Sequence, residues 1–280
     1  MSAKDGRVIF AGIDVGSLSA QAVILEDRRG ADRSNPSAGG RMSARSIHVT
    51  PNPVESARQV MGGLLEELGL SWDDIDYCVS TGYGREKVQG RGMARENISE
   101  ISCHGIGART LMPGVRTVID IGGQDAKVIR MDDRGELADF VMNDKCAAGT
   151  GRFLEVMSRT LGISFEELGP LALSARSRVE LSSRCSIFAE TEALHFLQRG
   201  AGGREVAAGI TRSMADRVAS LARRVGVERD VAMTGGVAKN ASVKAELERI
   251  LGVRLLAPPI DPQLIGAYGA AVLARRASNC

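Results

Sequence analysis

The sequence predicts an α/β protein made of two similar halves, and three observations lead to this prediction. A pattern of apolar strand, glycine turn and second strand occurs twice, at residues 8–25 and again at 117–131. Segments with helical periodicity follow both copies. The chain has 280 residues, which is enough for one large domain or two ordinary ones with buried cores. An internal repeat of this kind indicates two domains with similar topology.

The first copy predicts a β-hairpin. Residues 8–13 and 20–25 are apolar runs, and a turn at residues 14–17 follows the first of them. Residues 28–46, beyond the second run, are polar, rich in Gly, Ser, Ala and Arg, and lack periodicity, so we expect an extended mobile loop. Its basic residues could touch a partner, although composition alone favours a solvated hairpin tip.

The second copy repeats this arrangement. An apolar strand at residues 117–121 leads into the turn Gly-Gly-Gln-Asp, and a second strand follows. Placing Asp14 on Asp120 also places Gly16 on Gly122. Each copy therefore carries an aspartate and a glycine at equivalent positions of its turn.

The remaining elements complete each half. The predicted helices are 54–68, 206–225 and 263–276, and the predicted strands are 77–80 and 231–233. Helix 263–276 has the small residues that close helix crossings need. We therefore predict an N-terminal domain of residues 1–115 plus the C-terminal helix 263–280, and a C-terminal domain of residues 116–262.

The turns after Asp14 and Asp120 are suited to phosphate. Backbone N–H groups in such a turn converge on an anion, and a glycine without Cβ allows phosphate oxygens to approach closely. A carboxylate does not favour phosphate unless a Mg²⁺ ion offsets both charges, usually through water molecules. Two turns with an aspartate in the same place favour nucleotide binding over a pair of ordinary hairpins.

A third glycine turn, residues 234–237, follows the strand 231–233 and precedes a helix from about Asn240. Bare backbone there accommodates a planar base or a ribose, and the helix N-terminus faces an anion. A Rossmann interpretation is disfavoured because no G-x-G-x-x-G opens a helix after the first strand. The three turns together indicate a nucleotide site.

The stretches GIDVGSLSA, DIGGQD and TGGVAKN resemble the actin, hexokinase and heat-shock chaperone ATPase superfamily. The resemblance implies two RNase H-like (actin-like ATPase) domains that hold ATP and Mg²⁺ in a nucleotide cleft between them. It also implies that Asp14 and Asp120 organise Mg²⁺ and water, and that Gln124 or Asp125 orients the attacking water. The residues expected at the nucleotide are Gly12, Asp14, Gly16, Ser17, Gly122, Gly123, Gln124, Gly235 and Gly236.

Cys146 and Cys185 each precede a segment with helical periodicity, with Ser182 and Ser183 as plausible caps of the second. Five cysteines without a CxxC pair, in a chain without a recognisable export signal, argue against a disulfide framework. The positive end of a helix favours a thiolate or another anion. Two structural cysteines are one interpretation. Zinc and iron–sulfur clusters commonly take four ligands, which a dimer would supply.

Four runs are similar to the ATP-dependent activators of 2-hydroxyacyl-CoA dehydratases, in the family that includes the ATPase subunits of benzoyl-CoA reductase. The runs are VIDIGGQDAKVI, NDKCAAGTGRFLEVM, SSRCSIFAETE and MTGGVAKN. The resemblance implies a homodimer that binds two ATP and shares one [4Fe–4S] cluster, held by Cys146 and Cys185 of both subunits. It implies an electron supplied by a ferredoxin or flavodoxin and passed to a dehydratase.

Two alternatives stay open. Within the family, the chain could be the ATPase subunit of a benzoyl-CoA reductase complex. From another class, it could be a small-molecule kinase or a nucleotide-gated binding module with structural cysteines. The first turn also departs from the activators, which typically show GST and then a lysine in place of Gln21. Because Leu18 lacks a hydroxyl and Gln21 lacks a charge, we expect ATP binding through backbone contacts and Ser17, with altered affinity or rate.

Composition excludes several partners. The chain has 36 Lys and Arg against 34 Asp and Glu, so no global charge attracts nucleic acid or an anionic membrane. No apolar run approaches the ~18–20 residues that span a bilayer. We therefore expect a cytoplasmic protein. Cys78, Cys103 and Cys280 have no evident role.

Overall fold

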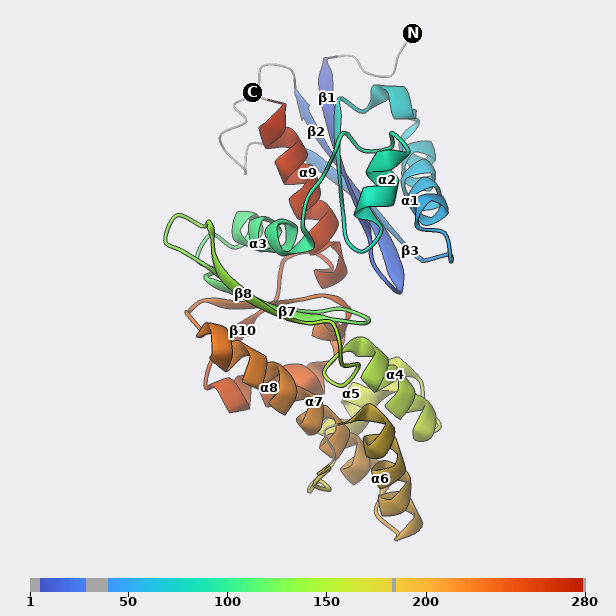
Figure 1. The fold of residues 1–280 in the computed structure, drawn as a ribbon, viewed down its shortest axis with the longest axis vertical. Coiled ribbons are helices and arrows are strands. Elements are labelled where there is room, and N and C mark those ends of the chain that lie inside the picture. Colours follow the sequence, from blue (N-terminus) through green and yellow to red (C-terminus); the bar gives the residue numbers. More distant parts are fainter. Residues whose placement is uncertain (1–5, 29–39, 183–184, 279–280) are drawn as a thin grey trace. The chain divides into compact units, whose positions relative to one another are not determined.

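The computed structural model describes residues 6–28, 40–182 and 185–278. The chain divides into two compact units (Figure 1). Unit 1 is Met1–Pro113 with Pro259–Cys280, and unit 2 is Gly114–Pro258. Among the described residues, no helix combines the length and the apolar character that crossing a membrane requires.

Unit 1 contains a five-stranded mixed sheet with the strand order β3-β2-β1-β4-β5. Its strands are β1 (Arg7–Val15), β2 (Ser19–Arg28), β3 (Arg41–His48), β4 (Tyr77–Thr81) and β5 (Glu96–Asn97). β1 is antiparallel to β2 and parallel to β4. β3 then extends the antiparallel side and β5 the parallel side.

Unit 2 repeats this topology with the order β10-β9-β6-β7-β8. Its strands are β6 (Thr117–Ile121), β7 (Ala126–Met131), β8 (Leu137–Asn143), β9 (Val231–Thr234) and β10 (Leu255–Leu256). β6 pairs with β7 antiparallel and with β9 in parallel, as β1 does with β2 and β4. The internal repeat is therefore confirmed: β6 is the counterpart of β1, and β7 the counterpart of β2.

The repeat extends to individual cross-strand pairs. Asp14 lies opposite Gln21 in the first hairpin, and Asp120 lies opposite Lys127 in the second. The same backbone frame therefore carries an amide beside one aspartate and an ammonium beside the other.

The helices pack around these sheets. Unit 1 has α1 (Pro53–Leu68), α2 (Arg85–Gly90), α3 (Glu100–Leu111) and α9 (Ile265–Ala277). Unit 2 has α4 (Gly151–Thr160), α5 (Phe165–Leu173), α6 (Ser186–Gln198), α7 (Gly203–Val225) and α8 (Ala241–Leu251). Short 3₁₀ turns are η1 (Trp72–Asp74), η2 (Gly236–Lys239) and η3 (Pro262–Leu264).

The predicted helices 54–68, 206–225 and 263–276 and strands 77–80 and 231–233 are confirmed to within a few residues. The prediction of a loop at residues 28–46 is wrong for residues 41–46, which form part of β3. Residues 29–39 of that predicted loop lie outside the described part of the chain. β3 is a half-exposed edge strand, so its sequence RMSARSIH lacks the alternation of apolar residues that identifies a strand.

Alternate residues of β1 enter two apolar layers. Ile9, Ala11 and Ile13 pack in a cluster with residues of α1, whereas Phe10 joins a cluster with residues of α9. Figure 1 shows α9, in red, alongside β1 and β2, in blue. Unit 1 is therefore a sheet with a buried layer on each face.

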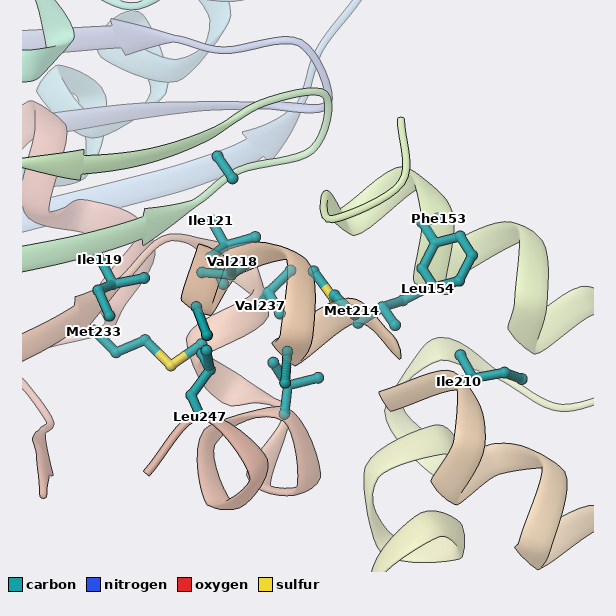
Figure 2. Packing of buried hydrophobic residues seen from close by; sticks show 14 of the residues in the cluster. Ile119, Ile121, Phe153, Leu154, Ile210, Met214, Val218, Met233, Val237 and Leu247 are labelled. Atoms are coloured by element: carbon teal, nitrogen blue, oxygen red, sulfur yellow. The ribbon is translucent and has the colours of Figure 1, made fainter. Parts of the chain in front are cut away.

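Unit 2 has one large cluster that joins the strands to the helices. The members labelled in Figure 2 are Ile119, Ile121, Phe153, Leu154, Ile210, Met214, Val218, Met233, Val237 and Leu247. They come from β6, α4, α7, β9, η2 and α8. The strands that end in glycine turns and the helix that follows Cys146 thus share one core.

Small residues let α9 approach its neighbours closely. A Cβ built on Gly12 would lie 2.0 Å from the Ala267 carbonyl oxygen of α9. A Cβ on Gly269 of α9 would lie 1.8 Å from the Cys103 carbonyl oxygen of α3. The predicted close crossing of helix 263–276 is therefore present, and Gly12 takes part in it from β1.

We expect Gly269→Ala to destabilise the protein by about 2–3 kcal/mol, because the new methyl group meets fixed backbone rather than a movable side chain. Urea unfolding would measure the change. Gly62→Ala is the matched control, since Gly62 lies inside α1 with open space around its Cα, and it should stabilise by about 0.5–1 kcal/mol. Equal effects of the two substitutions would contradict this account of the crossing.

Candidate functional site

The first glycine turn holds the Asp14 carboxylate near the end of β1. The Gly16 N–H donates to the Ser19 carbonyl oxygen at 3.0 Å and closes the turn. Asp14 is 7% exposed, and Cβ atoms built on Gly82 and Gly266 would lie 2.3 and 2.1 Å from its two oxygens. Bare Cα atoms of two other segments therefore enclose this carboxylate, leaving no room for side chains there.

The second turn has the same backbone and more polar side chains. The Gly122 N–H donates to the Asp125 carbonyl oxygen at 3.0 Å, as in the first turn. Thr234 Oγ1 donates to Asp120 Oδ1 at 2.9 Å, and Lys127 Nζ lies 3.3 Å from Asp120 Oδ2. Both oxygens of Asp120 are thus held by side chains.

The third glycine turn packs directly on the second. Gly235 has φ +82°, and a Cβ there would lie 2.4 Å from the Ile121 carbonyl oxygen and 2.8 Å from Asp120 Oδ1. α8 begins after this turn, with Asn240 accepting from the Val243 N–H as its cap. The second and third turns are therefore in direct contact within unit 2.

The structure places the expected nucleotide residues in two groups. Asp14, Gly16 and Ser17 belong to the first turn in unit 1. Unit 2 brings together the second and third turns, with Gln124 exposed at the tip. Gly12 faces α9, and that packing accounts for its missing side chain.

Asn143 organises the segment that carries Cys146. Its side chain accepts from the Cys146 N–H at 3.2 Å and donates to the Cys146 carbonyl oxygen at 2.9 Å. The Cys146 residue is exposed. The N-cap of α4 is Thr150, so Cys146 lies four residues before the helix cap rather than at the cap itself.

The first turn of α4 is hydrogen-bonded to the second glycine turn. The N–H groups of Gly151 and Arg152 donate to the carbonyl oxygens of Gly122 and Gly123, both at 2.8 Å. These are among the backbone N–H groups that a helix cannot satisfy internally. The segment containing Cys146 is thus joined to the candidate phosphate turn by main-chain hydrogen bonds.

Cys185 is itself the N-cap of α6, so the expected capping role of Ser182 is wrong. The backbone at Cys185 is still extended, and the helix begins at Ser186. Ser182 instead donates its N–H and hydroxyl to Glu192 of α6, at 3.0 and 2.8 Å. Ser183 lies outside the described residues.

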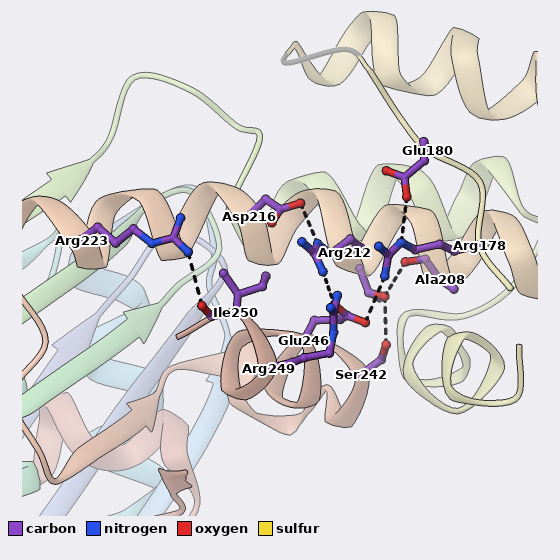
Figure 3. A network of polar contacts seen from close by, with 11 residues as sticks. Arg178, Glu180, Ala208, Arg212, Asp216, Arg223, Ser242, Glu246, Arg249 and Ile250 are labelled. Atoms are coloured by element: carbon purple, nitrogen blue, oxygen red, sulfur yellow. Dashed lines mark hydrogen bonds and ion pairs between the residues drawn. The ribbon is translucent and has the colours of Figure 1, made fainter. Parts of the chain in front are cut away.

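Ion pairs anchor the segment that leads to Cys185 (Figure 3). Arg178 pairs with Glu180 at 3.1 Å and with Glu246 of α8 at 4.0 Å. Glu246 also pairs with Arg212 of α7 at 3.2 Å, and the hydrogen bond to Asp216 raises the pKa of Arg212. α8, which follows the third glycine turn, therefore contacts the approach to Cys185.

The other described cysteines are of a different kind. Cys78 in β4 and Cys103 in α3 are buried, and burial raises the pKa of each thiol to about 12. None of the four described cysteines forms a disulfide. Among the described residues of one chain, no group of three or more His, Cys, Asp or Glu is arranged to hold a metal ion.

Sequence reasoning missed several residues that shape this site. Lys127, Asn143, Glu192 and Thr234 all fix a predicted turn or a cysteine segment. The internal repeat could have indicated Lys127, since it aligns with Gln21. The partners of Asn143 and Glu192 depend on the fold around them, and the sequence carries no periodic signal for them.

The duplicated sheet with a glycine turn at the same place in each copy defines a two-domain α/β ATPase of the actin and hexokinase type. More particularly, the chain belongs to the BadF/BadG/BcrA/BcrD ATPase family, which it matches over residues 11–274. It is 43% identical over 268 residues to the activator of lactoyl-CoA dehydratase of Anaerotignum propionicum, covering 96% of this chain and 98% of that one. It is 32% identical over 269 residues to a benzoyl-CoA reductase subunit of Thauera aromatica, covering 94% and 92%.

Two solved structures share the whole fold. One is the (R)-2-hydroxyglutaryl-CoA dehydratase component A of Acidaminococcus fermentans, with a TM-score of 0.88, 39% identity, and coverage of 98% of this chain and 100% of that one. The other is the activator of 2-hydroxyisocaproyl-CoA dehydratase of Clostridium difficile with bound ADPNP, with a TM-score of 0.87, 38% identity, and coverage of 97% and 96%. The similarity covers both units.

Alkylation should separate the cysteines into two classes. At pH 8 we expect iodoacetamide to modify Cys146 and Cys185 in the folded apoprotein, and Cys78 and Cys103 only after unfolding, because the thiolate is the reactive form. Mass spectrometry of peptides would measure each site. Modification of Cys78 at the rate of Cys146 would contradict the burial.

The same raised pKa values predict sensitivity to alkali. Because the folded pKa lies above the ordinary value of 9.0, the folded state keeps the Cys78 and Cys103 protons longer than the unfolded chain does. The free energy of unfolding should therefore decrease as pH rises from 9 to about 12. Cys78→Ala should reduce that decrease.

Proposed function

We propose that this chain is an ATP-hydrolysing activator that passes a low-potential electron to a 2-hydroxyacyl-CoA dehydratase. The observation that carries the proposal is the pair of hydrogen bonds from Gly151 and Arg152 to the turn at Gly122 and Gly123. It connects a candidate phosphate site to a cysteine segment within one unit. The names of the close relatives, which are activators of such dehydratases, support the choice of partner.

The nucleotide part of the proposal assigns roles to the three turns. The N–H groups of Gly16 and Gly122 close the two turns, so the backbone N–H groups of Ser17 and Gly123 bind the phosphate oxygens, and the bare Cα atoms of Gly16 and Gly122 let these oxygens approach. Gly235 and Gly236 face the adenosine. Gln124 or Asp125 orients the attacking water. Little covalent chemistry is required of the protein in phosphoryl transfer, so rigid turns with short polar groups are sufficient.

Mg²⁺ fits the carboxylates of Asp14 and Asp120. Both residues lie at the ends of strands and have buried carboxylates, and hard oxygen ligands suit this ion. A bound Mg²⁺ neutralises the charge that develops on the transferred phosphoryl group. Asp14 is enclosed by glycines and Asp120 by polar side chains, so each carboxylate keeps one orientation without reorganising.

Cys146 and Cys185 fit a shared [4Fe–4S] cluster. Cys146 is exposed, and Cys185 caps a helix whose N-terminal dipole offsets the charge of an anionic cluster. Each chain supplies two thiolates, so a homodimer supplies the four that such a cluster takes. When bound, the cluster holds one electron at a potential that its exposure and hydrogen bonds adjust.

Two connections would relay the nucleotide state to the cysteines. One runs from the second glycine turn through the hydrogen bonds at Gly151 to the Cys146 segment. The other runs from the third turn through α8 and Glu246 to Arg178, which precedes Cys185. Both lie within unit 2, whose strands and helices share one core.

The remaining partners follow from the same chemistry. A ferredoxin or flavodoxin in the cytoplasm is the proposed electron donor. A benzoyl-CoA reductase complex is the alternative acceptor, and the lower identity to a subunit of that enzyme, 32% against 43%, makes it second. A small-molecule kinase or a binding module with structural cysteines is disfavoured because structural cysteines are usually buried, whereas Cys146 is exposed.

We expect Cys146→Ala and Cys185→Ala each to abolish assembly of the cluster, because each chain would then supply one thiolate in place of two. Iron and acid-labile sulfide per dimer, measured after anaerobic reconstitution, test this. Cys78→Ala is the control and should keep the full content, since Cys78 is buried in the core of unit 1. A colourless, iron-free protein from the unmodified chain would support the kinase or binding-module interpretation instead.

We expect Gly151→Val to uncouple the nucleotide from the cluster. A Cβ at Gly151 would lie 3.0 Å from the Gly122 carbonyl oxygen, so valine displaces the first turn of α4 from the phosphate turn. The measurement is the rate at which bathophenanthroline removes cluster iron, with and without ATP. The effect of ATP on that rate should fall about tenfold.

Gly203→Val is the control for this substitution. Gly203 is also the first residue of its helix, α7, but a Cβ there meets nothing within 4 Å. Both variants carry the same change of helix propensity. An unchanged response to ATP in Gly151→Val, or an equal loss in Gly203→Val, would refute the coupling through α4.

A further inference from the structure

Lys127 is a buried cation that takes no part in the nucleotide and cluster binding proposed for the chain. It lies on β7, and its side chain is 2% exposed. Nζ lies 2.8 Å from Asp125 Oδ1 and 3.3 Å from Asp120 Oδ2. Both aspartates belong to the second glycine turn or its edge, so one ammonium binds two carboxylates beside the candidate phosphate site.

In the first hairpin, the position equivalent to Lys127 is occupied by an uncharged residue. There the equivalents of Asp125 and Lys127 are Ser19 and Gln21, and Gln21 Nε2 donates to Ser19 Oγ at 2.7 Å. The backbone hydrogen bond that closes the turn is 3.0 Å long in both copies. A neutral pair therefore maintains this turn geometry equally well, and the fold alone does not require the ion pair.

The charges differ in their access to solvent. The Asp120 side chain is 3% exposed, whereas that of Asp125 is 26% exposed. Removing an ammonium group from water is costly unless carboxylates accept hydrogen bonds from it. Lys127 thus approaches from the interior and binds Oδ1 of Asp125, whose side chain is partly exposed.

We propose that Lys127 is a positioning residue for ATP hydrolysis: it fixes Asp125, and with it Asp120, in the orientation that aligns the attacking water. The inference deepens the proposed function and rests on it, since Asp125 acts on water only if the second turn binds the phosphates. Without the ammonium, Asp125 and Asp120 repel each other and the bound phosphates, and Asp125 turns away from the site.

The test compares steady-state ATP hydrolysis by the unmodified full-length chain and by Lys127→Gln. Glutamine is the natural residue at the equivalent position of the first hairpin, so the strand accommodates it. We expect kcat to fall about 100-fold, because a small misplacement of a positioning group has effects of this size. KM for ATP should change less than about threefold, since the backbone contacts to phosphate remain.

Arg130→Gln is the matched control. Arg130 lies on the same strand and pairs with Glu228 at 3.0 Å, but it is placed opposite Thr117 at the far end of the hairpin. Loss of this ion pair should leave kcat within about twofold. An equal fall in kcat for both variants would overturn a specific role for Lys127.

The double variant Asp125→Ser with Lys127→Gln separates positioning from structure. It recreates the neutral pair of the first hairpin, so its thermal unfolding midpoint should return toward that of the unmodified chain while kcat stays low. If the double variant recovered kcat, the ion pair would be merely structural and the proposal would be overturned. It also keeps the test valid if Lys127→Gln alone fails to fold.

Measuring the iron and sulfide content of each variant distinguishes a failure of the role of Lys127 from a failure of the proposed function. Failure of the unmodified chain to take up iron and sulfide would overturn the activator role and leave the hydrolysis comparison standing. An unchanged kcat in a folded Lys127→Gln protein that carries its full cluster would overturn only the role of Lys127.

Discussion

Two main-chain hydrogen bonds, from the first turn of α4 to the carbonyl oxygens of Gly122 and Gly123, are the contacts on which the rest of unit 2 depends. Their donors would otherwise be unsatisfied at the helix start. Their acceptors belong to a turn whose remaining N–H groups can face a ligand. One side of the turn therefore contacts the helix, and the other side is the one that the proposed function assigns to phosphate. A displacement of the turn would displace the start of α4, and with it the segment that carries Cys146.

The two copies of the hairpin have the same backbone, but different groups surround the aspartate in each copy. In unit 1, the bare Cα atoms of Gly82 and Gly266 enclose Asp14. In unit 2, Thr234 and Lys127 bind Asp120 through side chains. These side-chain contacts join Asp120 to the neighbouring strands β7 and β9. Unit 2, in which these side-chain contacts form, also carries the cysteine segments.

The parts of the fold that are predictable from sequence are those with a local signal. Gly69 and Gly226 end helices whose apolar periodicity is strong, and the two hairpins repeat visibly. β3 is not predictable because the sequence of an edge strand with both faces half exposed does not alternate between apolar and polar residues. The N-cap at Cys185 is not predictable because Ser182, the expected cap, instead donates to Glu192 of α6. Such a contact depends on the direction of α6.

Lys127 illustrates why a candidate site is harder to predict than its scaffold. In the sequence AKVIRM it is an ordinary polar residue of a strand, and only the pairing of β6 with β7 places it opposite Asp120. The fold then removes its ammonium group from water, so that Lys127 is a buried charge held by carboxylates rather than a solvated residue of the surface. A carboxylate beside phosphate is unfavourable without such a charge or a metal ion. The buried lysine therefore explains how the second turn can hold an additional carboxylate, Asp125, where the first holds Ser19.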